Sequence, residues 1–337
     1  MSTEALKIPQ GYTSALSVHD TQIAIKTVKD FFQGLFAERM GLLRVTAPLF
    51  VDPDSGLNDN LNGVERPVDF TIAEGDRRAE IVQSLAKWKR YALQAYGFST
   101  GEGLYTDMNA IRRDEITDNL HSIYVDQWDW ERIITAQDRT LDYLKETVRT
   151  IYKVLRKTEK YMAIHYDYIE EFLPHDIFFI TTQELEDMFP DNTPREREYY
   201  IAKAKGAVCI MQIGDTLESG IRHDGRAPDY DDWKLNADIL VYYPVLDIAL
   251  ELSSMGIRVD SASLKEQLAK AGCEERASLP FQKSVLEGTL PLTIGGGIGQ
   301  SRLCLFFLRK AHIGEVQSSL WPDDVTKAAK KAGLQLL

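Results

Sequence analysis

Apolar and polar residues along the chain follow two different periods. Between residues 17 and 40 apolar side chains recur at helical spacing, and Ser17 and Asp20 suit a capping box at the start of this helix. Elsewhere short apolar runs alternate with polar residues, which predicts strands. The two patterns predict helices at 17–40, 86–97, 138–165 and 301–310, and strands at 41–50, 66–72, 77–85, 103–114, 121–133, 176–182, 207–213, 237–246 and 248–260.

The order of these elements indicates the fold class. The strands come in hairpins, of which 103–114 and 121–133 form the longest, and the helices lie between groups of strands. This order predicts an α+β fold with a mostly antiparallel sheet flanked by helices, and it argues against a doubly wound parallel sheet. Because no repeat or linker interrupts the pattern, we expect one domain over residues 1–337, with 1–16 as a flexible N-terminal arm.

Composition and charge exclude several classes of protein. The 337 residues are 44% hydrophobic and 27% charged, without the run of about 20 apolar residues that a membrane span needs. A net charge of −12 argues against nucleic acid or an anionic membrane as a partner. Three widely spaced cysteines fit neither a disulfide framework nor a zinc cluster, so we expect a cytoplasmic protein.

The glycine-rich stretch LTIGGGIGQSRL, residues 292–303, is the most unusual local feature. Its spacing matches neither the G-x-G-x-x-G dinucleotide fingerprint nor the P-loop. One interpretation is a tight strand-to-helix turn in which glycines permit positive φ and close packing. The other is a floor on which a flat ligand lies against bare backbone, with Arg302 in the first turn of the next helix pointing at an anion.

Other clusters of polar residues have more than one reading. Lys87, Lys89 and Arg90 form either a solvated basic face or, with Ser84, a site for a carboxylate. Gln127 and Asp129 are two residues apart in a strand and therefore share one face, which favours a polar binding floor over a buried core.

Two carboxylates, Asp238 and Glu251, stand in or beside apolar strands that are expected to pair. Magnesium typically takes one or two protein carboxylates together with phosphate oxygens. We therefore predict that Asp238 and Glu251 form a Mg²⁺ site facing a phosphate pocket.

Three segments, in order, resemble the motifs of the class II aminoacyl-tRNA synthetases. They are the strand GLLRVTAPLF, the hairpin with Arg112 and HSIYVDQWDW, and GGGIGQSRL. Together with NDNL, SLAKWKR, GEGLYT, RAPDYDDW and ELSSMGIRV, they more specifically resemble the ammonia-dependent type A asparagine synthetases, or aspartate–ammonia ligases, from about residue 20 to the C-terminus. The resemblance leaves no room for an appended anticodon-binding domain.

The resemblance implies an activity and its substrates. Such an enzyme converts L-aspartate and ammonia into L-asparagine with ATP and Mg²⁺, through a β-aspartyl-adenylate, and releases AMP and pyrophosphate. It also implies a homodimer whose two-fold interface is formed by the first motif.

The resemblance further implies roles for individual residues. The aspartate site would contain Asp59, Ser84, Lys89, Gln127, Asp129, Ser254 and Arg302. The ATP site would contain Arg112, Ser122, Glu251, Leu252, Arg258, Gly295, Gly296, Gly297 and Arg302. The reacting groups would be contacted by Arg112, Arg302, Asp59 and Gln127.

Within this set, Lys89 suits the α-carboxylate of aspartate, and Asp129 or Asp59 suits its α-ammonium. Because Asp59 lies in a polar turn, we also hypothesise that it accepts the proton of ammonium. Two alternatives remain: a synthetase-like paralogue that binds or adenylates an amino acid without using ammonia, and a regulatory ligand-binding protein on the same fold.

Overall fold

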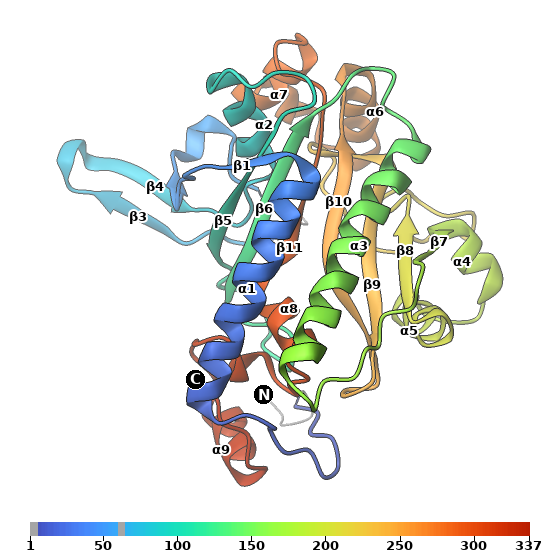
Figure 1. Ribbon diagram of the computed structural model, residues 1–337. Coiled ribbons are helices and arrows are strands. Elements are labelled where there is room, and N and C mark those ends of the chain that lie inside the picture. The colour runs from blue at the N-terminus through green and yellow to red at the C-terminus, as the bar shows by residue number, and fades with distance from the viewer. Residues whose placement is uncertain (1–5, 60–64) are drawn as a thin grey trace.

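The computed structural model describes residues 6–59 and 65–337, and a large sheet forms its centre (Figure 1). In spatial order its strands are β1 (Leu42–Arg44), β5 (Gly103–Ile111), β6 (Tyr124–Ile133), β11 (Thr293–Gly299), β10 (Ile248–Arg258), β9 (Asp231–Tyr243), β8 (Ala207–Met211) and β7 (Phe178–Thr181). Only the outer pairs β1–β5 and β7–β8 are parallel among these strands. The predicted mostly antiparallel sheet of an α+β fold is therefore confirmed.

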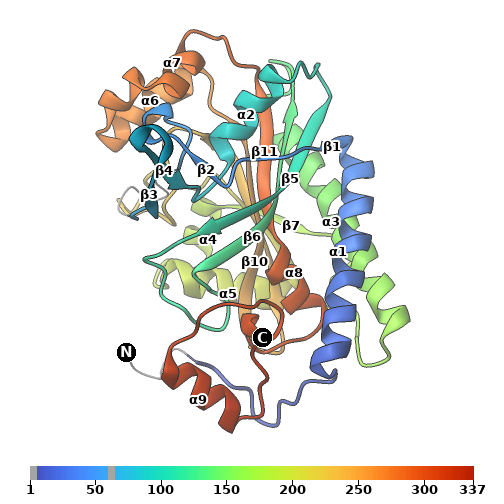
Figure 2. The same cartoon turned by 90° about the vertical axis from the view of Figure 1, so that its left-hand side faces the viewer.

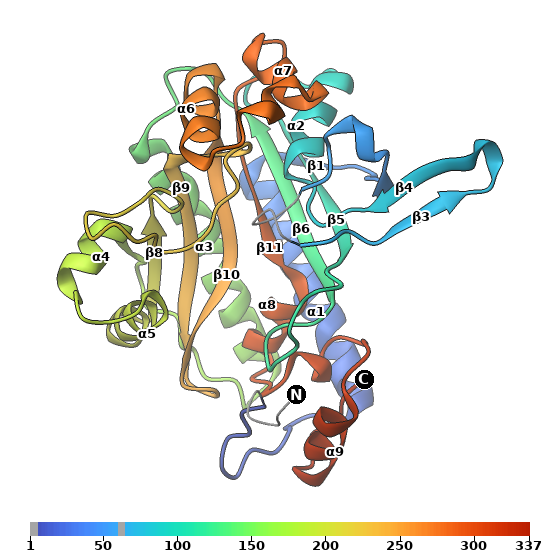
Figure 3. The ribbon, with the colours of Figure 1, turned by 180° about the vertical axis from the view of Figure 1, so that it is seen from behind.

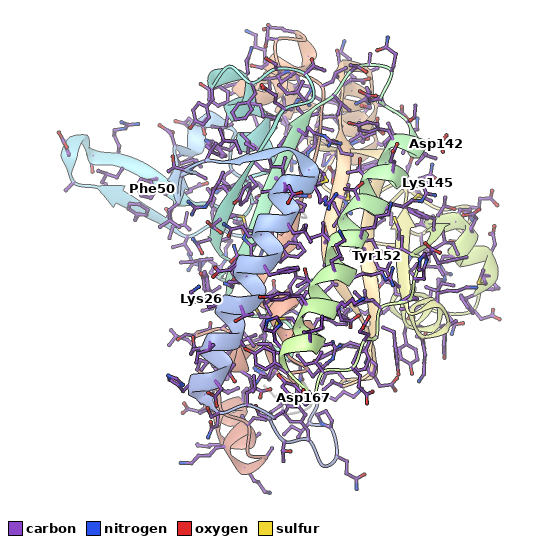
Figure 4. The ribbon with its side chains drawn as sticks, viewed as in Figure 1. Lys26, Phe50, Asp142, Lys145, Tyr152 and Asp167 are labelled. Atoms are coloured by element: carbon purple, nitrogen blue, oxygen red, sulfur yellow. The ribbon has the colours of Figure 1, made fainter. Side chains whose placement is uncertain are left out.

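Two long helices, α1 (Val18–Met40) and α3 (Leu141–His165), lie side by side on one face of the sheet (Figure 1). The buried side of α1 packs aromatic rings against β6: Phe32 stacks on Trp128, and Phe36 meets the ring of Trp130 edge-on. Figure 4 shows the side chains of this layer, with Lys26 on α1 and Tyr152 on α3. The core thus lies between the helices and every second residue of β6.

Smaller elements surround the sheet. A second sheet of β2 (Phe50–Val51), β4 (Arg77–Ile81) and β3 (Asp69–Ile72) projects to one side, and Phe50, labelled in Figure 4, lies near its base. The remaining helices are α2 (Ala86–Ala95), α4 (Thr182–Met188), α5 (Pro194–Lys205), α6 (Ser261–Ala271), α7 (Pro280–Leu286), α8 (Gln300–Phe307) and α9 (Asp323–Lys331). Short 3-10 turns occupy Pro53–Ser55, Glu74–Asp76, Glu274–Ser278 and Ile313–Glu315. No helix in the described ranges is long and apolar enough to cross a membrane.

Most predicted elements are present, with shifted ends. The first helix begins after Ser17, whose hydroxyl accepts a hydrogen bond from the backbone N–H of Asp20. The strand expected over 41–50 is split, because the chain leaves the large sheet after β1 and enters the second sheet only at Phe50, the first residue of β2. Conversely, β9 starts at Asp231, six residues before the expected start at 237.

The glycine-rich stretch is a strand, so its interpretation as a tight turn is wrong. Gly295, Gly296 and Gly297 pair with β6 on one side and β10 on the other, and none of the three has a positive φ. Isolated glycine weakens a strand, but it also permits close approach of neighbouring groups. The helix α8 begins at Gln300, so Arg302 does lie in its first turn as predicted.

The described part of the N-terminal arm, residues 6–16, contacts the body of the protein, and its flexibility stays a prediction. The backbone of Lys7 exchanges two hydrogen bonds with the side chain of Asn119, and the hydroxyl of Tyr12 donates to Glu315. Figure 2 shows this segment beside α9 at one end of the molecule. Residues 1–5 lie outside the described ranges.

Candidate active site

A cavity of about 460 Å³ opens on the sheet face opposite α1 and α3, the face seen in Figure 3. Alternation along β6 creates the two faces, because Trp128 and Trp130 point into the core whereas Gln127 and Asp129 line the cavity. Its other walls come from the β5–β6 loop, the start of α2, residues 224–231, β10, β11 and α8. The shared polar face predicted for Gln127 and Asp129 is therefore present.

The structure gathers the predicted aspartate residues at this cavity. Its lining includes Asp59, Ser84, Lys89, Gln127, Asp129, Ser254 and Arg302. Lys89 is 1% exposed, and its ammonium lies 3.3 Å from Asp129 and donates to the carbonyl oxygen of Gly296 at 2.9 Å. Burial lowers the pKa of Lys89, and the carboxylate of Asp129 acts in the opposite direction.

The turn that carries Asp59 is fixed by buried polar groups. The side-chain oxygen of Asn58 accepts from the backbone N–H groups of Asp59 and Gln83, both at 3.0 Å. Lys87 donates to the carbonyl of Asn58 and forms an ion pair of 2.9 Å with Asp229. Within the basic cluster 87–90, Lys87 therefore belongs neither to a solvated basic face nor to a site for a carboxylate ligand. It supports the turn that carries Asp59 instead.

The glycines of β11 make room for polar side chains of β6. A methyl group at Gly297 would stand 2.5 Å from Oε1 of Gln127 and 2.8 Å from Oδ1 of Asp129, and one at Gly295 would overlap the carboxylate of Glu131. Gly296 and Gly297 line the cavity. The space beside Gly295 is filled by Glu131, so a contact of all three glycines with ATP stays a prediction.

Two arginines reach the cavity from different elements. Arg112 follows β5, and its buried Nε has no hydrogen-bond partner among the described residues. Arg302 donates from NH1 to the carbonyl oxygen of Glu251 at 3.2 Å, and its guanidinium lies 3.7 Å from that residue's carboxylate. Ser122 and Leu252, also predicted to contact ATP, line the same space. Arg112 and Arg302 therefore border the same cavity.

The predicted metal pair lies on neighbouring strands. Asp238 opposes Ser254 in the register of β9 and β10, and it forms an ion pair of 2.6 Å with Arg226. Burial raises the pKa of Asp238 to about 7, Arg226 acts against this, and the nearby carboxylate of Glu251 adds to the rise. Glu251 lines the cavity, whereas Asp238 lies just behind the lining. Two carboxylates that repel each other suit a divalent cation.

Arg258 occupies a different environment from the one expected. Its guanidinium is 3% exposed, pairs with Glu131 at 2.8 Å, and also donates to Asp231. Burial disfavours the charged form, but the two carboxylates raise the pKa of Arg258 far above its ordinary value. Although Arg258 lines the cavity, its main partners are protein carboxylates, and its predicted contact with ATP stays a prediction.

Sequence reasoning missed Arg226. Its guanidinium donates to Oγ of Ser254 at 2.5 Å and to Asp238 at 2.6 Å, and it lines the cavity. Arg226 thereby joins the predicted aspartate site to the predicted metal pair. The segment RAPDYDDW contains it, but the role depends on strands 12 and 28 residues further along the chain, which no local pattern reveals.

Comparison with known proteins identifies the family. The family model "Aspartate-ammonia ligase" matches residues 19–333. The chain is 61% identical to an aspartate–ammonia ligase of Ruminiclostridium cellulolyticum, over 98% of both chains. It is also 61% identical to that of Clostridium tetani, over 99% of this chain and 98% of the relative.

Solved structures support the fold assignment. The asparaginyl-tRNA synthetase from Pyrococcus horikoshii, complexed with asparaginyl-adenylate, superimposes with a TM-score of 0.63 at 14% identity, over 90% of this chain and 70% of the synthetase. The fold is that of class II aminoacyl-tRNA synthetase catalytic cores. With the family match, this shows that the chain belongs to the aspartate–ammonia ligases, enzymes that make asparagine from aspartate and ammonia.

Proposed function

We propose that the enzyme activates the side-chain carboxylate of L-aspartate with ATP as β-aspartyl-adenylate, and that ammonia then displaces AMP. The observation that carries this proposal is the convergence of Arg112 and Arg302 on one cavity that also contains the predicted aspartate residues. An adenylate-forming site must hold an α-phosphate beside the carboxylate that attacks it. The synthetase of the same fold was solved with an adenylate, which agrees with this chemistry.

In the first step an oxygen of the aspartate side chain attacks the α-phosphorus of ATP, and the bond to pyrophosphate breaks. Negative charge builds on the phosphoryl oxygens as this happens. Arg112 and Arg302 donate hydrogen bonds to those oxygens from two sides and stabilise the transition state. Gln127, on the same cavity floor, orients the carboxylate.

The α-carboxylate and the α-ammonium of the substrate aspartate are proposed to bind beside charged side chains that are already paired in the cavity. Lys89 and Asp129 already form a buried pair at 3.3 Å. The α-carboxylate of the substrate binds toward Lys89, and its α-ammonium binds toward Asp129 or Asp59. This arrangement pairs every charge and directs the side-chain carboxylate toward the two arginines.

Asp238 and Glu251 would hold Mg²⁺ on the polyphosphate. Among the described residues that line the cavity, nine are aspartate or glutamate and five are lysine or arginine, and Asp114 and Asp126 of the nine also pair with an arginine and a lysine outside the lining. A cation would therefore help this lining to hold a polyphosphate. When bound, the cation supplies charge neutralisation and orientation of the phosphates. The protein's part is to keep Asp238 close to Glu251 with Arg226 as its present counter-charge.

In the second step ammonia attacks the carbonyl carbon of the adenylate, AMP leaves with the bonding electrons, and the attached nitrogen loses one proton to water to give the amide. Ammonium has no free electron pair and must first lose a proton. Asp59, 1% exposed at the cavity wall, is the proposed acceptor.

One assay tests the overall route. The enzyme is incubated with aspartate, ATP, Mg²⁺ and ammonium, and asparagine, AMP and ADP are followed together. We expect equal amounts of asparagine and AMP, and a fall of at least about 100-fold in the rate for Arg112→Gln or Arg302→Gln. Formation of ADP would eliminate the adenylate. Absence of asparagine would favour the synthetase-like paralogue.

The role of Asp59 separates the two steps. Asp59→Asn should abolish asparagine formation but retain aspartate-dependent exchange of pyrophosphate into ATP, because adenylate formation needs no proton acceptor. If exchange falls as far as synthesis, Asp59 binds aspartate rather than ammonium.

The enzyme is also proposed to act as a homodimer in the cytoplasm. The three cysteines, all buried and unpaired, suit a reducing compartment.

A further inference from the structure

Asn119 lies in the loop between β5 and β6, residues 112–123, which begins with Arg112 and contains Ser122 near its end. It is 6% exposed, although it is a polar residue in a connecting loop. Figure 3 shows this loop approaching the N-terminal segment and the chain that follows α8. A buried amide at such a place must find partners or lower the stability of the fold.

The side chain of Asn119 joins three segments that are distant in sequence. Its amide nitrogen donates to the carbonyl oxygens of Lys7 and Ala311, both at 2.7 Å. Its amide oxygen accepts from the backbone N–H of Lys7, also at 2.7 Å. Both of its N–H donors and its oxygen are therefore used, which fixes the orientation of the side chain.

Backbone and side-chain bonds around Asn119 hold the rest of the loop. The carbonyl of Asn119 accepts from the N–H of Ile313 at 2.8 Å, and Oγ of Ser122 donates to Oγ of Ser319 at 2.8 Å. Asp118 accepts from the backbone of Leu120 and His121. Of these residues, Leu120, His121, Ser122 and Ile313 line the cavity.

We propose that Asn119 is a positioning residue for nucleotide binding: it fastens the loop that carries Arg112 and Ser122 to the N-terminal arm, residues 6–16, and to the segment 311–319. The N-terminal arm thereby supports the ATP site although it does not line the cavity. This inference rests on the proposed function, in which Arg112 and Ser122 bind ATP.

The aspartate side of the cavity is held by other contacts. Lys89 and Asp129 sit on α2 and β6, and their positions depend on each other and on the carbonyl of Gly296. Loosening the β5–β6 loop should therefore weaken ATP binding and leave aspartate binding largely intact. This difference separates positioning from a general loss of stability.

The test compares full-length variants. Asn119→Ala removes all three side-chain hydrogen bonds. Lys7→Pro removes the backbone N–H that donates to the side-chain oxygen of Asn119. Lys7→Ala keeps both backbone hydrogen bonds and is the matched control. Because small misplacements of positioning groups lower activity strongly, Asn119→Ala should raise KM for ATP about tenfold or more and Lys7→Pro about threefold. KM for aspartate should change by less than about twofold in every variant, and Lys7→Ala should match the wild type.

The double variant Lys7→Pro/Asn119→Ala gives a second readout. Since both changes break the same link, it should resemble Asn119→Ala within about twofold rather than show the product of the two effects. Equal rises in both KM values, unchanged KM for ATP, or independent effects in the double variant would overturn the proposal. Lys7→Pro decides alone if Asn119→Ala does not fold.

The proposed function is tested independently of the role of Asn119. It is tested by AMP formation in the wild type and by loss of activity in Arg112→Gln, neither of which depends on Asn119 or Lys7. Direct titration of ATP into each variant shows whether the change in KM reflects binding.

Discussion

Adjacent glycines of β11 have opposite surroundings, and this gives a prediction for single residues. A methyl group at Gly297 would meet the ends of Gln127 and Asp129, whereas one at Gly296 would stand 2.6 Å from the carbonyl oxygen of Ser254 and from Cβ of Met255. Side-chain ends can shift, but a neighbouring strand cannot. Gly297→Ala should therefore raise KM for aspartate at least about tenfold with little change in stability.

Gly296→Ala is the matched control for this change. It should lower the free energy of unfolding by about 1–3 kcal/mol, because overpacking displaces the backbone of β10. Thermal unfolding and the KM for aspartate, measured on both variants, show which glycine serves packing and which serves substrate binding. If Gly297→Ala unfolds first and leaves KM unchanged, the glycine serves packing rather than the substrate.

His312 gives a prediction about pH. Its ring is fully buried, Nδ1 accepts from the N–H of Gly314, and Trp321 packs against it. Burial lowers the pKa of His312 to about 4, although Asp118 acts in the opposite direction. Between pH 6.5 and 4 the unfolded chain therefore binds a proton that the folded chain does not, so stability falls as pH falls.

Through His312 the free energy of unfolding should fall by about 3 kcal/mol between pH 6.5 and pH 4. His312→Asn keeps an acceptor for Gly314 and removes the titration. Urea unfolding at pH 7 and pH 4.5 should show a smaller loss of stability in the variant than in the wild type. Parallel loss in both proteins would assign the effect to other groups.

At the scale of elements, the periodicity of apolar residues predicted those helices and strands whose faces are set by local sequence. The first long helix and the hairpin of β5 and β6 could be predicted because one face of each is consistently apolar or polar. The strand β11 could not be assigned from the local pattern, because Gly295, Gly296 and Gly297 have no side chains to show alternation. Its pairing with β6 and β10 in the structure identifies it as a strand.

The residues of the candidate site also fall into two groups, those that local sequence predicts and those that it does not. Gln127, Asp129 and Arg302 could be placed because strand alternation and the helix start fix their direction. The pairing of Arg226 with Asp238 and the link from Asn119 to Lys7 join segments 12 and 112 residues apart. Such contacts depend on the tertiary fold, so a single sequence does not reveal them.

The link between α2 and the loop before β9 gives a prediction at this scale. Lys87 is 4% exposed and pairs with Asp229, which also accepts from Gln282 at 2.7 Å. Burial by itself would raise the pKa of Asp229, but Lys87 and Gln282 hold it below its usual value. Lys87→Met should therefore lower the free energy of unfolding by about 3 kcal/mol at pH 7, since the buried carboxylate loses its nearest cation and keeps only Arg276, 3.8 Å away.

The same variant should respond to pH in a characteristic direction. Without Lys87 the pKa of Asp229 rises, so the deficit relative to the wild type should shrink as pH falls toward 4. Urea unfolding at several pH values measures this. A deficit that is independent of pH would mean that the lost packing of the lysine, rather than its charge, matters.

At the scale of the whole molecule, the edge of the large sheet points to a second copy. Within the described ranges β1 pairs only with β5, so its outer edge is open. Leu43 is 62% exposed, and Leu49 and Phe50 nearby are 51% and 43% exposed. An open strand edge beside exposed apolar side chains is typical of an interface, and a two-fold axis lets the same patch cover itself.

We therefore expect a homodimer through β1, and Leu43→Asp should dissociate it because a carboxylate would be buried against its own copy across the axis. Light scattering coupled to size exclusion should give twice the chain mass for the wild type and one chain mass for Leu43→Asp at micromolar concentration. Leu320→Asp is the matched control, since Leu320 is 79% exposed and lies far along the chain from β1. A wild-type monomer, or a Leu43→Asp variant that remains dimeric, would place the interface elsewhere or remove it.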